Sequence, residues 1–263
     1  MTLDRFVRVK YRYEEEKVEK LTEILGELGI ECARTIEEKV DLQFDALKHL
    51  HYSLNDTETF LKLVIANSIV SYQLTAKGEE WWWEFSRYFS NSPPKNGIRV
   101  AYSQFLPNSR TNRRLISGKL KRLEKLEPFL ESLTLDEMEE YYFNNMLGLR
   151  DKLAEVMKSK KSAKTIVFSV KMFGYGARIA FSRFVPYPME IEIPDDVRIN
   201  AYTKRFTNEP AALFWSRIAE EVNIPPLHID SILWPVLGGN DEVMIRLRKH
   251  CPSWKRILEL SNL

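Results

Sequence analysis

A lysine at the start of an apolar helix pattern is the residue of this chain best suited to covalent chemistry. The segment KSKKSAKTIVFSVKMF changes from a polar break to an apolar pattern at Lys164, and Phe168 follows on the same helix face. Apolar surroundings and neighbouring cations favour a neutral amine, and only a neutral amine is a nucleophile. Lys164 is therefore a candidate nucleophile, although a solvated lysine in a first helical turn is the commoner case.

An aspartate pair could supply the carboxylate that works with such a lysine. Asp195 and Asp196 lie where the alternating stretch PMEIEIP ends and a helix pattern begins, which is an N-cap position. A capping carboxylate accepts backbone N–H bonds that favour its charged form. A fixed anion there could stabilise positive charge developing on a sugar, as in glycoside chemistry. A purely structural helix cap is the alternative.

Two aromatic segments could bind a planar heterocycle. GEEWWWEF contains three successive tryptophans at 81–83, and helical neighbours point about 100° apart, so we expect at least one to face a cleft or solvent. In PPLHIDSILW, Asp230 and Trp234 lie on one helix face. An aromatic surface beside a hydrogen-bond acceptor suits a nucleic-acid base. A core tryptophan with a hydrogen-bonded aspartate is the alternative.

Local clusters of basic residues could bind DNA phosphates. The net charge of +2 gives no general attraction to nucleic acid, so binding would depend on such clusters. Neutralising phosphates releases counterions, but solvated helix faces explain such runs equally well. The residues with this pattern are Arg110, Arg113, Arg114, Lys158, Lys160 and Lys161.

Composition excludes several classes of protein. With 263 residues, 44% of them hydrophobic and 29% charged, the chain is globular and forms one large or two small domains. It has no apolar run that could cross a bilayer and no signal-peptide core. Two cysteines, Cys32 and Cys251, argue against a disulfide scaffold and four-cysteine metal centres. We expect a cytoplasmic protein without metal, cofactor or membrane contact.

Helical periodicity dominates the elements that must position these residues. A rich apolar run after residue 55 predicts a central helix, with Asn55 as N-cap and Glu58 completing a capping box, and Thr134 with Glu137 repeats that pattern. The polar break before Lys164 predicts a helix–hairpin–helix, whose second helix has free N–H groups for phosphate.

Two stretches alternate in hydropathy instead of following a helical period. VRVKYRY at 7–13 and PMEIEIP at 188–194 favour short strands, one basic and one acidic on its polar face. The two strands could pair, and two separate extended segments are equally compatible with the pattern.

The chain resembles the archaeal 8-oxoguanine DNA glycosylase family (AGOG), a branch of the helix–hairpin–helix glycosylases. The resemblance runs from DLQFDAL near residue 41 to HIDSILWP near residue 235, and rests on VSYQLTAKGEEWW, KTIVFSVK, IPDDVRI and IPPLHIDSILW in that order. It implies an all-α, two-lobed fold with the active site between the lobes, with room for a minor two-strand patch. We expect a central helical domain at 57–181 and a second lobe from 1–56 plus 182–263.

The resemblance also implies an enzyme that excises 8-oxoguanine through a lysine Schiff base and cuts the strand by β-elimination. It makes Lys164 the nucleophile and Asp196 the assisting carboxylate. It places around the extruded base Gln43, Ser71, Trp82, Phe168, Pro194, Asp230 and Trp234. Of these, Gln43, Ser71 and Pro194 come from the resemblance alone. We expect Trp82 and Phe168 to be the plates that hold the base.

Partners and alternatives follow from the same resemblance. The partner would be double-stranded or single-stranded DNA containing oxidised guanine, bound by a monomer associated with the nucleoid. The hairpin KSKKSA lacks the glycine that is usual in the superfamily, a departure that fits the archaeal branch. One alternative is a glycosylase for another oxidised base. The other is a non-catalytic helical DNA-binding protein in which Lys164 only contacts phosphate.

Overall fold

The structure, a computed structural model, describes residues 11–194 and 196–263, and its regular secondary structure is helical, which confirms the all-α prediction. The helices are α1 (Glu15–Lys39), α2 (Leu42–Leu54), α3 (Thr57–Ile69), α4 (Gly78–Asn91), α5 (Ile98–Phe105), η1 (Leu106–Asn108), α6 (Ile116–Ser132), η2 (Glu137–Tyr142), α7 (Met146–Met157), α8 (Lys164–Phe181), α9 (Val197–Thr203), α10 (Ala211–Val222), α11 (Pro226–Gly238), α12 (Asp241–His250), α13 (Trp254–Glu259) and η3 (Leu260–Asn262).

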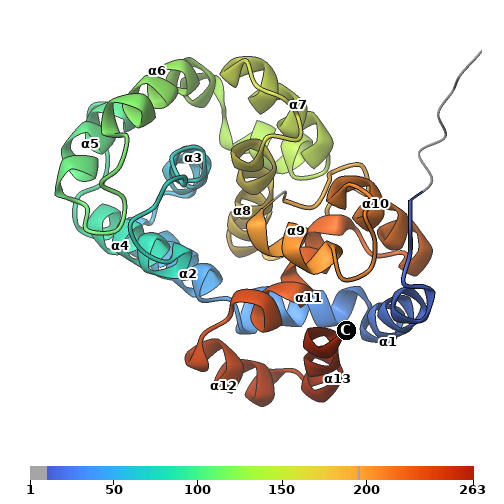
Figure 1. The fold of residues 1–263 in the computed structure, drawn as a ribbon. Helices are drawn as coiled ribbons and strands as arrows, with labels where there is room; N and C mark the ends of the chain where they lie inside the picture. Colours follow the sequence, from blue (N-terminus) through green and yellow to red (C-terminus); the bar gives the residue numbers. More distant parts are fainter. Residues whose placement is uncertain (1–10, 195) are drawn as a thin grey trace, which may run out of the picture.

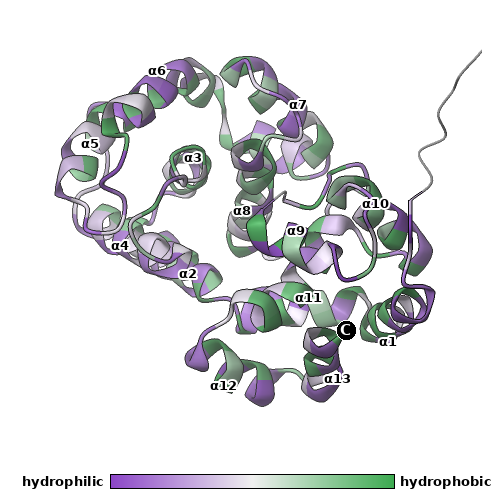
Figure 2. Cartoon of the chain, viewed as in Figure 1, coloured by the Kyte–Doolittle hydropathy of each residue, from purple (hydrophilic) through white to green (hydrophobic). Residues whose placement is uncertain are grey.

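The apolar helix predicted after residue 55 is the centre of the first half of the molecule. Figure 1 shows α3 end-on inside a ring of α2, α4, α5, α6, α7 and α8, and in Figure 2 it is largely green. All its residues from Leu63 to Ile69 are buried, which explains why its sequence is apolar all round. The predicted N-cap is wrong by one residue. Asn55 ends α2 in the left-handed conformation, and Asp56 caps α3 by accepting the Thr59 N–H at 3.0 Å.

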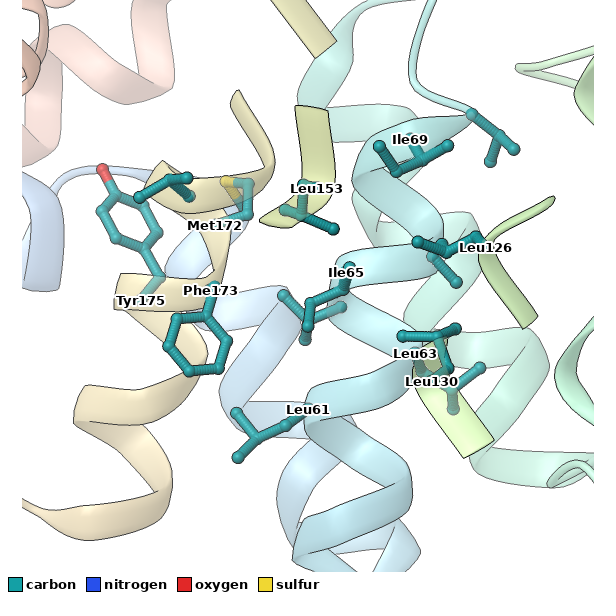
Figure 3. Close-up of a cluster of buried hydrophobic side chains, with 14 of the residues drawn as sticks. Leu61, Leu63, Ile65, Ile69, Leu126, Leu130, Leu153, Met172, Phe173 and Tyr175 are labelled. Atoms are coloured by element: carbon teal, nitrogen blue, oxygen red, sulfur yellow. The ribbon is translucent and has the colours of Figure 1, made fainter. Parts of the chain in front are cut away.

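Buried side chains form two hydrophobic clusters. The first lies among α2 to α8, where Leu63 of α3 lies with Leu126 and Leu130 of α6 (Figure 3). The second lies among α1 and α9 to α13. The domain limits predicted from the sequence stay a prediction, but the packing differs from them at α2. Its buried apolar residues from Phe44 to Leu50 belong to the first cluster, because α2 packs on α3, α4 and α8, and only Leu42 at its start belongs to the second.

The strand predicted at 188–194 is wrong, and the pairing with 7–13 that the sequence left open is absent between the described residues of the two segments. The segment 188–194 forms a turn, in which the Ile191 N–H donates to the Pro188 carbonyl at 3.3 Å. Its alternation has another cause, since Ile191 packs in the first cluster and Ile193 in the second. Tyr13 forms an isolated bridge with Thr207, and residues 7–10 of the other predicted strand lie outside the described part.

The helix–hairpin–helix is formed by α7 and α8, as predicted. Lys158 adopts a left-handed conformation (φ 51°, ψ 51°) at the end of α7. Its N–H donates to Glu155 O at 3.0 Å and the Ser159 N–H donates to Ala154 O at 2.9 Å, the Schellman pattern. Lys158 therefore takes the position that glycine usually occupies, and the chain turns into α8 without a glycine.

A cluster of buried charged and polar side chains from α1, α8 and α11 links the two hydrophobic clusters. Glu37 of α1 is fully buried and accepts hydrogen bonds from Arg178 of α8 and Ser231 of α11, and it also contacts His228 of α11 at 2.8 Å. Burial alone would raise the pKa of Glu37, but the charge of Arg178 together with His228 and Lys171 outweighs it and holds that pKa well below its usual range. The cluster fixes α1, α8 and α11 relative to one another.

Candidate active site

A pocket of about 400 Å³ contains the described residues that were predicted to do chemistry or to bind a base, whereas Asp195, the other candidate carboxylate, lies outside the described residues. It lies between α2, the 71–79 segment, α8, the start of α9 and α11. The predicted residues that line it are Gln43, Ser71, Trp82, Lys164, Phe168, Pro194, Asp196, Asp230 and Trp234. Larger hollows of about 880 and 780 Å³ lie elsewhere, but neither is lined by Lys164 or Asp196. Residues from both halves of the chain therefore meet in one place.

Lys164 and Asp196 face each other at this pocket. Lys164 is the first residue of α8, and its Nζ lies 3.5 Å from Oδ2 of Asp196. The expected apolar enclosure of the lysine is wrong, because its side chain is 56% exposed and its nearest charged neighbour is this carboxylate. The fold thus presents an accessible amine whose charge is balanced by a fixed anion.

Asp196 is held in place by the start of α9. Its Oδ1 accepts the N–H groups of Arg198 and Ile199, both at 2.9 Å, so it is the N-cap that the sequence predicts. Its Oδ2 is left to face Lys164 and the Arg198 guanidinium, at 3.4 Å from Nη2. Partial burial would raise the pKa of Asp196, but the Ile199 N–H bond and the charge of Lys164 outweigh it and lower the pKa. The carboxyl is therefore an anion and not a proton donor at neutral pH.

A second lysine of the pocket, Lys171, was missed in the sequence. It lies seven residues after Lys164, so both lie on the face of α8 that lines the pocket. Its Nζ lies 2.6 Å from Oδ2 of Asp230, and the side chain is only 8% exposed. Burial would lower the pKa of Lys171, but the charges of Asp230 and Glu37 raise it above its usual value. Lys171 is consequently a bound ammonium, which leaves Lys164 as the accessible amine.

Asp41 is another wall residue that sequence reasoning missed. It caps α2 by accepting the Gln43 N–H at 2.9 Å, and it accepts the Tyr175 hydroxyl at 3.1 Å. Burial raises the pKa of Asp41 to about 6. The cap fixes the first turn of α2 and with it Gln43, which lines the pocket. A signal existed in DLQF, where an aspartate directly precedes a helix pattern.

Two buried polar atoms in the pocket wall have no hydrogen-bond partner among the described residues. They are Oε1 of Gln43, an acceptor, and Nε1 of Trp82, a donor. An unsatisfied buried polar group costs about 1–3 kcal/mol, so these two atoms are available to hydrogen-bond a ligand in the pocket. By contrast, the Ser71 hydroxyl is occupied, since it donates to Asn67 O and accepts from Trp81 Nε1.

The aromatic plates differ from the prediction. The rings of Trp82 and Phe168 meet edge to face, with centroids 6.1 Å apart and planes at 66°. A flat base cannot lie parallel to both, so the expectation of two plates is wrong for this pair. Trp82 is fully buried and offers its Nε1, whereas Phe168 and Trp234 are half-buried rings of the pocket. The expectation that one tryptophan of the triplet faces a cleft is confirmed by Trp82.

The predicted phosphate-binding residues are exposed and lie on two loops. Lys158, Lys160 and Lys161 are in the hairpin before α8, where Lys161 also pairs with Asp151 at 2.6 Å. The arginines Arg110, Arg113 and Arg114 precede α6. None of these six residues lines the pocket, so any contact with DNA would be outside it.

The arginine loop before α6 is rigidly attached near the pocket. Glu84 accepts hydrogen bonds from Ser109 Oγ at 2.9 Å and Thr111 N at 3.0 Å. The side-chain amide of Asn112 donates to Val70 O at 3.1 Å, and this bond ties the loop to the segment that carries Ser71. The loop ends in Leu115, which is 60% exposed and left-handed at φ 56°. An exposed leucine in this conformation is strained, and such strain is commonest at functional sites.

Neither a metal cluster nor a membrane span is found in the described chain. Within residues 11–194 and 196–263, no three histidine, cysteine or acidic side chains lie close enough to hold a metal ion. None of the helices in those ranges combines the length and the hydrophobicity that crossing a bilayer requires.

Comparisons with known proteins agree with this geometry. Residues 22–259 match the family described as AGOG, N-glycosylase/DNA lyase. The chain is 69% identical over 263 residues to an N-glycosylase/DNA lyase of Thermococcus kodakarensis, covering 100% of both chains. It is 47% identical over 249 residues to an N-glycosylase/DNA lyase of Methanococcus maripaludis, covering 94% of this chain and 98% of the other. The crystal structure of an 8-oxoguanine DNA glycosylase from Pyrobaculum aerophilum, complexed with 8-oxoguanosine, has a similar fold, with a TM-score of 0.78 at 23% identity and coverage of 94% and 96%.

Proposed function

This chain belongs to the AGOG family of N-glycosylases/DNA lyases, and we propose that it excises 8-oxoguanine from DNA with Lys164 as nucleophile. The observation that carries this proposal is the pair of Lys164 Nζ and Asp196 Oδ2 at the mouth of a pocket with two unpaired polar groups in its wall. The substrate is double-stranded or single-stranded DNA containing oxidised guanine. The enzyme acts as a monomer in the cytoplasm, associated with the nucleoid.

The reaction begins when the damaged nucleotide leaves the base stack and enters the pocket. Extrusion costs a few kcal/mol, roughly, which contacts in the pocket offset. Nζ of Lys164, after losing a proton to solvent, attacks the sugar C1′, and the base leaves with the electrons of its bond to C1′ and takes up a proton. Breaking of the bond between C1′ and the ring oxygen then turns the adduct into a Schiff base. Asp196 stabilises the positive charge that develops on the sugar and the amine. The resulting Schiff base then promotes β-elimination, which cuts the strand.

The two unpaired groups suit the edge that distinguishes 8-oxoguanine from guanine. Oxidation makes N7 a donor and adds a carbonyl acceptor at C8. The Gln43 acceptor and the Trp82 donor could pair with these two groups. Plain guanine would leave the Gln43 acceptor unpaired, at a cost of about 1–3 kcal/mol. The remaining predicted residues, Ser71, Phe168, Pro194, Asp230 and Trp234, form the rest of the wall.

DNA outside the pocket is bound by the two exposed basic loops. The hairpin lysines and Arg110, Arg113 and Arg114 contact phosphates on either side of the extruded nucleotide. Leu115 extends the arginine loop with an exposed apolar side chain. Apolar side chains on DNA-binding proteins often enter between base steps, so we assign Leu115 to that contact.

Borohydride trapping tests the proposal. A reducible Schiff base between the enzyme and an 8-oxoguanine duplex should give a covalent adduct, and peptide mapping should place it on Lys164. Lys161→Gln is a matched control, since Lys161 is an exposed lysine of the same hairpin. An adduct with a thymine glycol duplex alone would move the substrate to oxidised pyrimidines. No adduct with either duplex would favour a non-catalytic DNA-binding protein.

A further inference from the structure

The two cysteines of the chain lie side by side although 219 residues separate them. Cys32 is a half-buried residue of α1, and Cys251 is the buried residue that ends α12. Their sulfur atoms are 3.5 Å apart. Neither residue lines the pocket or any of the other hollows described above. The proposed reaction therefore gives no reason for this pairing.

We propose that Cys32 and Cys251 are an oxidation site, at which a small peroxide joins them in a disulfide that links α1 to the C-terminal helices. The sulfur atoms need to approach from 3.5 Å to the bond length of about 2.05 Å. Both thiols are free in the structure, so the bond would form in the folded protein. This proposal goes beyond the glycosylase reaction and does not depend on it.

The surroundings of the two sulfurs decide which one reacts first. One of the two thiols donates to the sulfur of the other, and the Ser253 N–H donates to Cys251. These bonds lower the pKa of Cys251 to about 7, while the shared proton raises the pKa of Cys32 above its usual value. The backbone N–H bond therefore favours the thiolate form at Cys251, and only a small oxidant can reach this sulfur because the residue is 2% exposed.

The oxidation proceeds in two balanced steps. The Cys251 thiolate attacks one peroxide oxygen, the O–O bond breaks, and a sulfenic acid and hydroxide form. The Cys32 sulfur then attacks the Cys251 sulfur, and the sulfenic oxygen leaves as water once it takes up a proton. The sum is two thiols and one hydrogen peroxide giving one disulfide and two waters. The two thiols are oxidised by two electrons, and the peroxide is reduced by two.

The disulfide would restrict the unfolded chain far more than the folded one. It would close a loop of more than 200 residues, and the entropy lost by the unfolded state grows with loop length. Bonds of this kind commonly raise the melting temperature by about 5–15 °C in proteins of this size. Activity at moderate temperature should not change, because the site lies outside the pocket.

The test compares reduced and peroxide-treated full-length protein. Intact mass should fall by two hydrogen atoms, and non-reducing peptide mapping should join the peptides of Cys32 and Cys251. The melting temperature should rise by about 5–15 °C and return after treatment with a thiol reductant. The rate of oxidation should rise with pH through about 7, the pKa of Cys251.

Single variants supply the matched controls. Cys32→Ser and Cys251→Ala should each show the same melting temperature before and after peroxide, whatever their own stability. Thiols that stay free after peroxide, or disulfides between two molecules, would overturn the proposed site. A disulfide within one molecule that leaves the melting temperature unchanged would overturn its stabilising role.

Discussion

Asp196→Asn separates the two tasks that the structure gives this residue. The carboxylate caps α9 through Oδ1 and faces Lys164 through Oδ2. Asparagine keeps an oxygen for the two N–H groups and places an amide where Oδ2 was. Since asparagine caps a helix about as well as aspartate, the substitution removes the charge and leaves the cap.

The expected effect on stability is small. The cations that face Oδ2 are about half exposed, at 56% for Lys164 and 50% for Arg198. Exposed ion pairs contribute about 0–1 kcal/mol, so the melting temperature should fall by no more than about 4 °C. The pKa of folded Asp196 is lowered, so the stability it adds is complete above its unfolded pKa and is lost as pH falls through the folded pKa. The asparagine variant should lack this loss.

The expected effect on the reaction is much larger. The Asp196 side chain is only 15% exposed, so its charge acts in a partly enclosed site. Removing one preorganised electrostatic group from an active site costs about 2.7–4 kcal/mol of barrier. Each 1.36 kcal/mol is about tenfold in rate, so base release should slow by about a hundredfold to a thousandfold. A small change in melting with a large change in rate is the signature of a catalytic anion.

A single-turnover assay on an 8-oxoguanine duplex, run beside a thermal melt, measures both effects. Asp56→Asn is the matched control, because Asp56 caps α3 by the same type of bond at 3.0 Å and does not line the pocket. The control should release base at the normal rate. If Asp196→Asn also kept the normal rate, the carboxylate would be a helix cap alone and the proposed mechanism would lose its anion.

Four further substitutions test other parts of the site. Lys164→Gln should abolish base release and borohydride trapping while lesion binding by gel shift stays measurable; normal strand cutting would remove Lys164 from the mechanism. Trp82→Phe keeps a ring but removes Nε1, so binding to lesion duplex should weaken by about 1–3 kcal/mol while binding to undamaged duplex changes little. Equal loss of affinity for both duplexes would make Trp82 a structural residue. Leu115→Gly removes the apolar side chain, so titrations should show weaker duplex binding. Because glycine also relieves the left-handed strain, the melting temperature should not fall, and unchanged binding would refute the DNA contact. Lys171→Met should lower the free energy of unfolding by about 3–5 kcal/mol in denaturant titrations, because Asp230 would be left unpaired. The double variant with Asp230→Leu should recover most of that stability, and failure to recover it would mean that the lost ion pair is not the cause.

The sequence predicts the parts of the fold that depend on local pattern. The apolar run of α3, the polar break before Lys164 and the capping box of Thr134 with Glu137 all depend on residues close in the chain. The structure contains all three, including the paired bonds between Thr134 and Glu137 at 3.0 and 3.2 Å. The strand predicted at 188–194 fails for a physical reason, since the chain turns there and the two isoleucines, which an extended strand would place on one side, pack in different clusters.

The site is harder to predict because its properties depend on contacts between distant segments. That Lys171 is a bound ammonium follows from Asp230, 59 residues away, and from the charge of the still more distant Glu37. The 66° angle between Trp82 and Phe168 depends on how α4 and α8 are each placed by packing on α2. The residues named from the resemblance line the pocket, but their roles stay proposals until the substitutions above are measured.

Glu37 makes the folding of one half of the molecule depend on the other. It comes from α1 in the second cluster, and its main countercharge, Arg178, comes from α8 in the first. If the halves folded separately, Glu37 would keep His228 and Ser231 of α11 but lose its main countercharge, and Arg178 would lose its carboxylate, at a cost of several kcal/mol, roughly. The halves are therefore expected to unfold together in one cooperative transition. Neither would be a stable fragment if the chain were divided between them.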